Sequence, residues 1–158
     1  MNRITFLGTG TSTGVPYLGC DCPTCASTDP RDKRLRCSAL VQTASANILI
    51  DCSPDFREQM LRLNFRGTLD ALFITHEHYD HVGGIDDLRP FSYTRSLPIY
   101  ADPYAASHLR QRLPYCLVEN KYPGVPQLQL HDLQPYETVM VNHTEVTALQ
   151  VMQGQLAV

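Results

Sequence analysis

The chain has 158 residues, of which 43% are hydrophobic and 18% charged, so it is long enough to bury one globular core. Its net charge of −3 and its scattered lysines and arginines argue against an extended nucleic-acid surface. No apolar run approaches the roughly 20 residues that cross a bilayer, and the N-terminus lacks a secretory apolar region. We therefore expect a single cytoplasmic domain over residues 1–158, whose six cysteines are reduced thiols or metal ligands.

The first expected elements are a strand over residues 3–7 and a loop over residues 8–16, which contains three glycines and four hydroxyl residues. Such a loop turns tightly and leaves backbone N–H groups exposed, as an anion-binding loop does. A plain connecting loop is the alternative, because the Lys-Ser/Thr ending of a P-loop is absent. The candidates for contact with a substrate are Thr9, Gly10, Thr11 and Ser12.

Three cysteines then follow at spacings of two and three: Cys20, Cys22 and Cys25. Their thiolates can converge on one structural zinc, although such a site normally has a fourth ligand. Three independent reduced thiols are the alternative. The remaining cysteines are isolated in the sequence, and we expect them to be small core residues. These are Cys37, Cys52 and Cys116.

The middle of the chain predicts strands and helices in alternation. Runs over 39–43 and 47–51 predict a hairpin around residues 44–46, and Ser53 with Pro54 predicts the start of a helix that ends at Leu63. The apolar side chains expected to face the core from this helix are Phe56, Met60, Leu61 and Leu63. Further expected elements are strands over 69–75, 98–101, 127–130, 138–141 and 145–152, a helical turn over 85–88, and a helix through Arg112 that Asp102 and Pro103 begin. Hairpins followed by this alternation indicate a layered α/β domain.

The strand over 69–75 leads directly into His76, His78, Asp80 and His81. Imidazoles and a carboxylate suit zinc, manganese or iron, and a chance polar loop is a poor explanation for four such groups within six residues. His76 and His78 are two residues apart in an extended segment and can face one side. Asp80 and His81 follow where the backbone turns, so they can reach a second position nearby. This layout predicts two metals rather than one.

Two metals roughly 3.5–4 Å apart would clamp a substrate oxygen and hold a bridging hydroxide. Asp80 is the candidate to hold the water and move its proton. Asp51, at the end of a neighbouring strand, is either an acceptor for the N–H of a ligand histidine or a turn carboxylate. Glu77 and Tyr79 are expected to point the other way, with Tyr79 in a packing role. The histidines that remain as weaker ligand candidates are His108, His131 and His143.

Three segments resemble the metallo-β-lactamase superfamily: residues 6–16, residues 48–51 and the H-x-H-x-D-H run of residues 76–81. Within that superfamily, the cysteine cluster and residues 50–57 resemble the PhnP-type phosphodiesterases, which act on cyclic phosphate diesters. The opening loop is also similar to that of tRNase Z. The resemblance implies an α/β (α+β) αββα sandwich with a dinuclear site between its sheets. His76 and His78 would hold one metal, Asp80 and His81 the other, and Asp51 matches the supporting aspartate.

The resemblance also implies that the three cysteines bind a structural zinc together with a late histidine. Family members are longer, so this chain corresponds to the N-terminal half to two-thirds of the sandwich. Gln153 stands where a ligand histidine is expected, and a neutral amide is a poor zinc ligand. A half-sandwich would expose a sheet face and an edge, which predicts a homodimer or other self-association.

These observations predict a metal-dependent hydrolase, foremost a phosphodiesterase for a small (cyclic) phosphate diester. It would carry two divalent metals, zinc or manganese, and one structural zinc. The alternatives are a degenerate or truncated non-catalytic member that binds metal weakly or has a structural role, and a tRNA 3′-end endonuclease.

Overall fold

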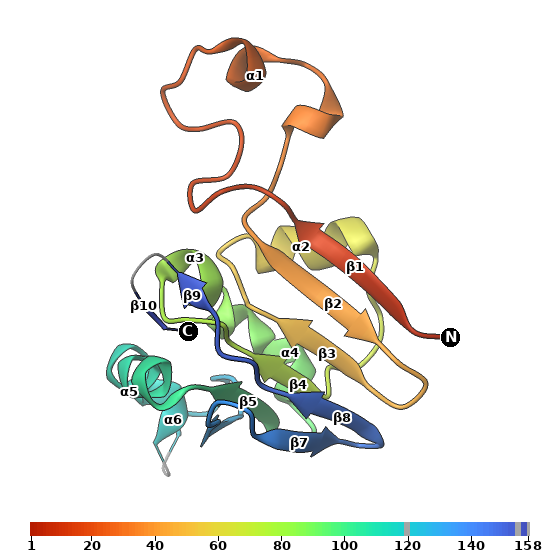
Figure 1. Ribbon diagram of the computed structural model, residues 1–158, viewed down its shortest axis with the longest axis vertical. Helices are drawn as coiled ribbons and strands as arrows, with labels where there is room; N and C mark the ends of the chain where they lie inside the picture. Colours follow the sequence, from red (N-terminus) through yellow and green to blue (C-terminus); the bar gives the residue numbers. More distant parts are fainter. Residues whose placement is uncertain (119–120, 154–155, 158) are drawn as a thin grey trace.

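The computed structural model describes residues 1–118, 121–153 and 156–157. Its centre is a six-stranded sheet in the order β1-β2-β3-β4-β5-β6 (Figure 1). The first three strands are antiparallel neighbours, and β3 to β6 are parallel neighbours. The strands are β1 (Arg3–Gly8), β2 (Ser38–Gln42), β3 (Asn47–Ile50), β4 (Ala71–Phe73), β5 (Leu97–Ala101) and β6 (Leu128–Asp132). A hairpin followed by helix-connected parallel strands confirms the predicted α/β class.

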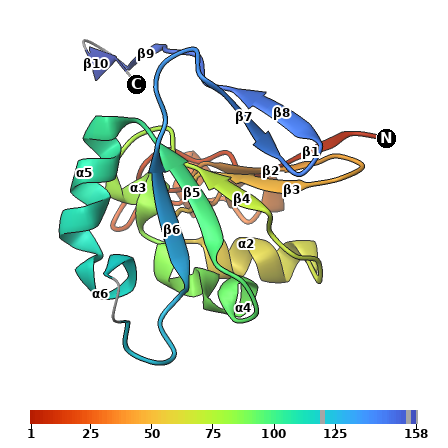
Figure 2. The same cartoon turned by 90° about the horizontal axis from the view of Figure 1, so that it is seen from below.

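Helices cover one face of this sheet (Figure 2). They pack on a row of apolar side chains that crosses four neighbouring strands, namely Leu40, Leu49, Leu72 and Ile99, each at most 1% exposed. The helical elements of the chain are α1 (Pro23–Ala26), η1 (Pro30–Asp32), α2 (Phe56–Leu63), α3 (Tyr79–Val82), η2 (Ile85–Leu88), α4 (Arg89–Ser92), α5 (Pro103–Arg112) and α6 (Pro114–Leu117). Over the described residues, none of them is long and apolar enough to span a membrane.

The opposite face of the sheet carries a hairpin of β7 (Thr138–Val141) and β8 (Thr144–Thr147). Phe73 from the large sheet and Val141 from the hairpin belong to the second core cluster. A short pair, β9 (Met152–Gln153) and β10 (Leu156–Ala157), follows. The order helix, sheet, sheet confirms the predicted metallo-β-lactamase layering, of which the described residues supply three of the four layers.

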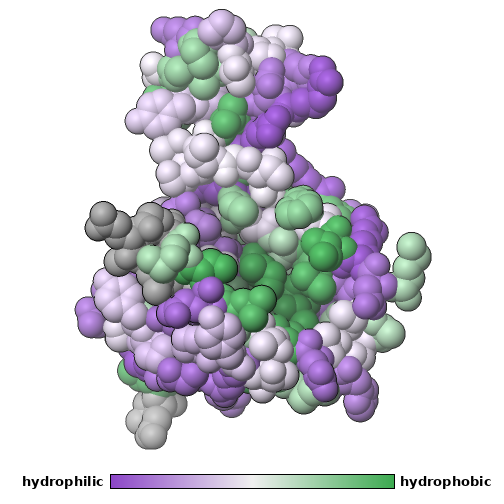
Figure 3. Space-filling model, in the orientation of Figure 1, coloured by the Kyte–Doolittle hydropathy of each residue, from purple (hydrophilic) through white to green (hydrophobic). Residues whose placement is uncertain are grey.

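Part of the hairpin face is uncovered. Ile4 and Phe6 of the edge strand β1 are 64% and 72% exposed, and the register places them in line with Ile48 and Ile50. Figure 3 shows the apolar area that results over the strands of the large sheet. This is the exposed sheet face that the sequence predicted.

The start of α2 differs from the prediction. The helix begins at Phe56 with Asp55 as its N-cap, two residues later than the Ser53–Pro54 pair indicated. Ser53 instead forms a turn, in which its hydroxyl accepts the Asp55 N–H and its carbonyl accepts the Phe56 N–H. Leu61 is 55% exposed and does not face the core. Gln59, which was not expected in the core, is 2% exposed and donates to the Arg36 carbonyl.

Of the remaining predictions for helix caps, cysteines and strands, some are confirmed and others are wrong. Asp102 caps α5 by accepting the N–H groups of Tyr104 and Ala105, as predicted. Cys52 and Cys116 are buried, but Cys37 is exposed just before β2, so its assignment to the core is wrong. The strand expected over 145–152 is broken, because β8 ends at Thr147 and β9 begins only at Met152.

Candidate metal centre

Parallel pairing of β3 and β4 builds the site. Ile50 and Phe73 are register partners at the ends of these strands, so Asp51 and the segment from Thr75 to His76 leave the same edge of the sheet. The Asp51 N–H donates to the Phe73 carbonyl at 2.8 Å. The carboxyl ends of parallel strands are where α/β sheets place their binding residues. Helix α3 begins directly after His78 and carries Asp80 and His81.

The four predicted ligands form one cluster. The ring centroids of His76 and His78 are 4.7 Å apart, and those of His76 and His81 are 4.0 Å apart. His81 Nε2 lies 3.1 Å from Asp80 Oδ2. Within the described part of the chain, however, no three of these side chains bring ligand atoms within 4.8 Å of one another. These four side chains therefore lie near one another without forming a three-ligand site among the described residues.

Asp51 lies beside the cluster and contacts His81 and Thr75. It is 3% exposed and adopts a φ of 57°, a left-handed conformation that aspartate tolerates better than most residues. Its Oδ2 lies 2.7 Å from His81 Nδ1, and its Oδ1 accepts the Thr75 N–H at 2.8 Å. Of the two roles that the sequence allowed, the structure therefore shows the histidine acceptor. The aspartate turns His81 Nε2 toward Asp80.

His76 and His81 have opposite electrostatic surroundings. Burial lowers the pKa of His76, and the charges of His81 and His78 lower it further. Burial also lowers the pKa of His81, but the hydrogen bond to Asp51 and the charges of Asp51 and Asp80 outweigh it, so that pKa is raised overall. His76 thus favours the neutral form that a metal ligand needs, while His81 sits in a negative environment that also attracts a cation.

The residues between the ligands behave differently from one another. Tyr79 is 66% exposed, and its ring lies over Gly83, where a Cβ would come within 2.9 Å of the tyrosine Cζ. This contact agrees with the packing role expected for Tyr79. Glu77 does not point away as predicted, because its carboxylate lies 3.9 Å from His78 Nε2 and its side chain is 13% exposed.

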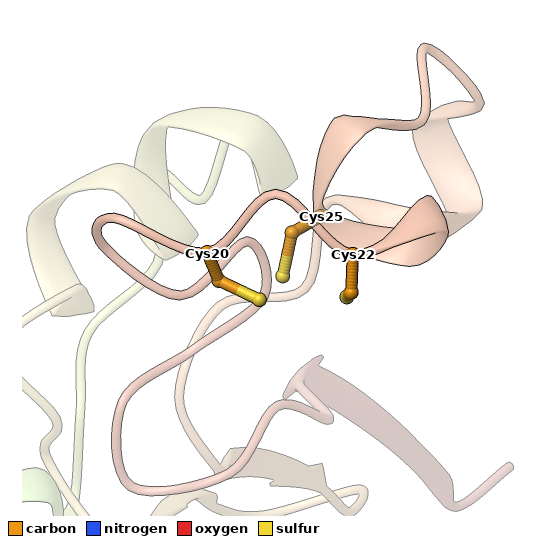
Figure 4. Close-up of side chains that lie close together, drawn as sticks. All are labelled: Cys20, Cys22 and Cys25. Carbon is orange, nitrogen blue, oxygen red and sulfur yellow. The ribbon is translucent and has the colours of Figure 1, made fainter.

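The three cysteines meet in a lobe that projects from the sheet (Figures 1 and 4). The sulfur atoms of Cys20, Cys22 and Cys25 lie within 4.8 Å of one another. Cys25 Sγ also accepts the Tyr17 N–H at 3.3 Å. A backbone hydrogen bond from Cys25 and the neighbouring thiols lower the pKa of Cys22, which favours the thiolate that binds metal. Three soft sulfur donors suit zinc.

The opening loop, residues 8–16, offers fewer free backbone groups for contact with a substrate than expected. The Gly10 N–H donates to the Leu35 carbonyl at 2.7 Å, so the prediction that it faces an anion is wrong. The Ser12 carbonyl accepts from Arg36 Nε. Thr9, Thr11 and Ser12 remain exposed and can still contact a substrate.

The weaker histidine candidates have other surroundings. His108 Nδ1 lies 3.0 Å from the Tyr104 carbonyl, and His131 stacks on Tyr100 with ring centroids 5.1 Å apart. His143 is exposed in the turn between β7 and β8. The side chain of Gln153 lies outside the described residues, so the prediction for that position stays a prediction.

Comparison with known proteins agrees with this geometry. Residues 46–157 match the family model described as the beta-lactamase superfamily domain. The chain belongs to the metallo-β-lactamase superfamily. It is of the PhnP-like type, since it superposes on a solved diphosphatase of the PhnP family with a TM-score of 0.87 at 36% identity, over 99% of this chain and 61% of that one. Fold and family are thus as predicted.

Two curated relatives are also similar to this chain in sequence. An octanoyltransferase of Porphyromonas gingivalis is 48% identical over 159 residues, which are 99% of this chain and 32% of that protein. A ribonuclease Z of Myxococcus xanthus is 30% identical over 141 residues, which are 87% of this chain and 39% of that protein. The chain therefore spans about a third of the length of these relatives.

Proposed function

We propose that this chain carries the metal-binding face of a hydrolase for small phosphodiesters, cyclic phosphate diesters included. The observation that carries the proposal is the gathering of His76, His78, Asp80 and His81 beside the buried Asp51. The 36% identity to a PhnP-family diphosphatase supports phosphoester chemistry as the reaction class. Because the chain spans 61% of that structure, substrate and activity are both part of the proposal.

The donor set fits two divalent ions at this cluster and one zinc at the cysteines. Nδ1 of His76 lies 3.0 Å from the Thr75 hydroxyl, and Nδ1 of His81 lies 2.7 Å from Asp51, so a cation would be held through Nε2 of each ring. Imidazole and carboxylate donors accept zinc or manganese, whereas three thiolates favour zinc. When bound, the two metal ions would supply a hydroxide nucleophile at neutral pH and offset the negative charge of the phosphate.

The protein's own groups then have distinct tasks. Asp80, whose side chain is 17% exposed, is placed to accept and hold the proton of the attacking water. Asp51 keeps His81 oriented through the 2.7 Å contact with Nδ1. The exposed Thr9, Thr11 and Ser12 of the opening loop are candidates to contact the phosphate oxygens.

The test is turnover of bis(p-nitrophenyl) phosphate by the chain supplied with Zn²⁺ or Mn²⁺, together with elemental analysis of bound metal. His76→Ala is expected to abolish turnover, and His143→Ala, in an exposed turn, should leave it unchanged. A metal-free protein would overturn the site, and a metal-loaded protein without diesterase activity would overturn the reaction.

A second candidate is tRNA 3′-end cleavage, which the ribonuclease Z relative favours. The net charge of −3 and the scattered basic residues weigh against it, because RNA binding rests largely on phosphate contacts. Cleavage of a precursor tRNA under conditions in which bis(p-nitrophenyl) phosphate is not hydrolysed would decide for this candidate.

We also propose that the chain self-associates through the uncovered sheet face. Ile4 and Phe6 expose apolar surface on an edge strand, a combination that promotes pairing between copies. Phe6→Glu is expected to shift the protein toward monomer in concentration-dependent light scattering. Tyr122→Glu removes a ring that is 77% exposed and serves as the control. A wild-type protein that stays a monodisperse monomer at every concentration contradicts the proposal.

A further inference from the structure

Arg112, the last residue of α5, reaches the backbone of the segment that carries the candidate metal ligands. Its Nη1 donates to the Glu77 carbonyl at 2.7 Å, across 35 positions of the chain. Glu77 stands between His76 and His78, so this carbonyl belongs to the loop that joins the two histidines. A side chain from α5 therefore holds the backbone between two candidate ligands.

The two ends of the ligand segment are held differently. At the far end, the Cys52 N–H donates to the His81 carbonyl and the Gly84 N–H donates to the Cys52 carbonyl, at 2.7 and 2.9 Å. These bonds tie the end of α3 to the segment that follows β3. Among the described residues, the backbone of residues 77–80 makes one hydrogen bond to another element, and its donor is Arg112.

Side-chain packing on this near end of the segment is weak. The His78 side chain is 52% exposed, and Tyr79 is 66% exposed. The Glu77 carboxylate lies 3.9 Å from His78 Nε2, which is too far for a hydrogen bond. A loop with so few contacts has other conformations available, and apparent metal affinity falls with the fraction of molecules in the binding-competent one. The contact from Arg112 should raise that fraction.

The charge of Arg112 acts in the opposite direction. A guanidinium beside the cluster repels a divalent cation, so removal of the charge alone would strengthen metal binding. Loss of the hydrogen bond to Glu77 would weaken it. The sign of the change in metal affinity therefore shows whether Arg112 acts through its hydrogen bond.

We propose that Arg112 is a positioning residue, which holds the Glu77 carbonyl and so keeps His78 in place for metal binding. The inference rests on the proposed metal site but not on the identity of the substrate. A net contribution typical of one protein hydrogen bond corresponds to about 2–10-fold in an equilibrium constant. The effect on metal affinity should lie within that range.

The matched variants are Arg112→Met, which keeps an unbranched side chain without charge or donor, and Arg112→Lys, which keeps both. Titration with Mn²⁺ alone, followed by electron paramagnetic resonance of the free ion, reports on the histidine cluster, since manganese prefers oxygen donors to thiolates. We expect Arg112→Met to bind Mn²⁺ about 2–10-fold more weakly than wild type and Arg112→Lys to recover most of the loss. The control is Arg110→Met, because Arg110 lies on the same helix but donates to Asp132. Equal or tighter binding by Arg112→Met would overturn the proposal.

Amide hydrogen exchange of the metal-free protein tests the same contact without any metal. The His81 N–H donates to the His78 carbonyl and the Gly83 N–H donates to the Tyr79 carbonyl, so both amides report on the near end of the segment. Arg112→Met should speed their exchange by about 2–10-fold. The Gly84 amide, which is tied to Cys52, should not change. Unchanged exchange at His81 and Gly83 would overturn the inference.

Activity separates this inference from the proposed function. A wild-type protein that binds no Mn²⁺ would overturn the metal site, and amide exchange would then decide the role of Arg112. Metal binding without hydrolysis of bis(p-nitrophenyl) phosphate would overturn only the reaction. In an active protein at saturating Mn²⁺, Arg112→Met should regain the kcat and KM of wild type, because a positioning residue acts through metal binding. A raised KM at saturating Mn²⁺ would assign Arg112 to substrate contact and overturn the positioning role.

Discussion

Asp80→Asn is expected to lower the rate of bis(p-nitrophenyl) phosphate hydrolysis by about 10³-fold, the middle of the range for loss of a general acid or base. Asparagine keeps the shape of the side chain but neither accepts a proton nor carries the charge that faces His81 Nε2 at 3.1 Å. The measurement is kcat at saturating Mn²⁺. Asp87→Asn removes an equal charge from an exposed position in η2 and should leave kcat unchanged.

The metal content of Asp80→Asn separates the two tasks that this carboxylate could have. A variant that loses rate but keeps wild-type stoichiometry identifies Asp80 as the group that holds and moves the proton. A variant that loses one ion together with rate identifies it mainly as a ligand. Retention of most of the wild-type rate would contradict either task, and with it the proposed site.

Zinc binding at the cysteine lobe is expected to cause a large change in the number of reactive thiols. In the metal-free native protein, four of the six thiols should react with Ellman's reagent, because Cys52 and Cys116 are buried. Burial also raises the pKa of Cys116 to about 11, which suppresses its thiolate further. One equivalent of Zn²⁺ should reduce the count from four to one. The protected thiols would be those that lie within 4.8 Å of one another, namely Cys20, Cys22 and Cys25.

The thiol that stays reactive with zinc bound should be Cys37. It is exposed, but partial burial and the charges of Asp51 and Asp80 raise its pKa, so it should react more slowly than the free Cys22 thiol, whose pKa is lowered. Cys37→Ser should therefore reduce the zinc-loaded count to zero. If three thiols continue to react in the presence of equimolar Zn²⁺, the cysteine lobe is not a zinc site.

The features that sequence alone predicted correctly are those made by neighbours in the chain. Three such features involve residues within a few positions of one another. They are the strand-to-loop transition that leads to residues 76–81, the cysteine cluster of residues 20–25, and the Asp102 cap of α5. Short apolar runs bounded by turn residues likewise sufficed to predict the strands of the large sheet.

Tertiary structure decided which partners the polar groups have. The segment around Leu35 takes the N–H of Gly10, a contact across 25 positions that no local pattern could indicate. On α2 the buried side is the one that carries Gln59, which donates to the Arg36 carbonyl, while Leu61 faces solvent. Cys37 is exposed just before β2 begins.

The metal centre shows the same division. The sequence alone indicated the candidate ligands, because their spacing is local. Only the parallel pairing of β3 with β4 placed Asp51 beside Thr75 and His81, 24 and 30 positions further along the chain. That placement decides which acceptor lies beside Nδ1 of His81. A hydrogen bond depends on what approaches within about 3 Å, and for residues this far apart the fold decides that distance.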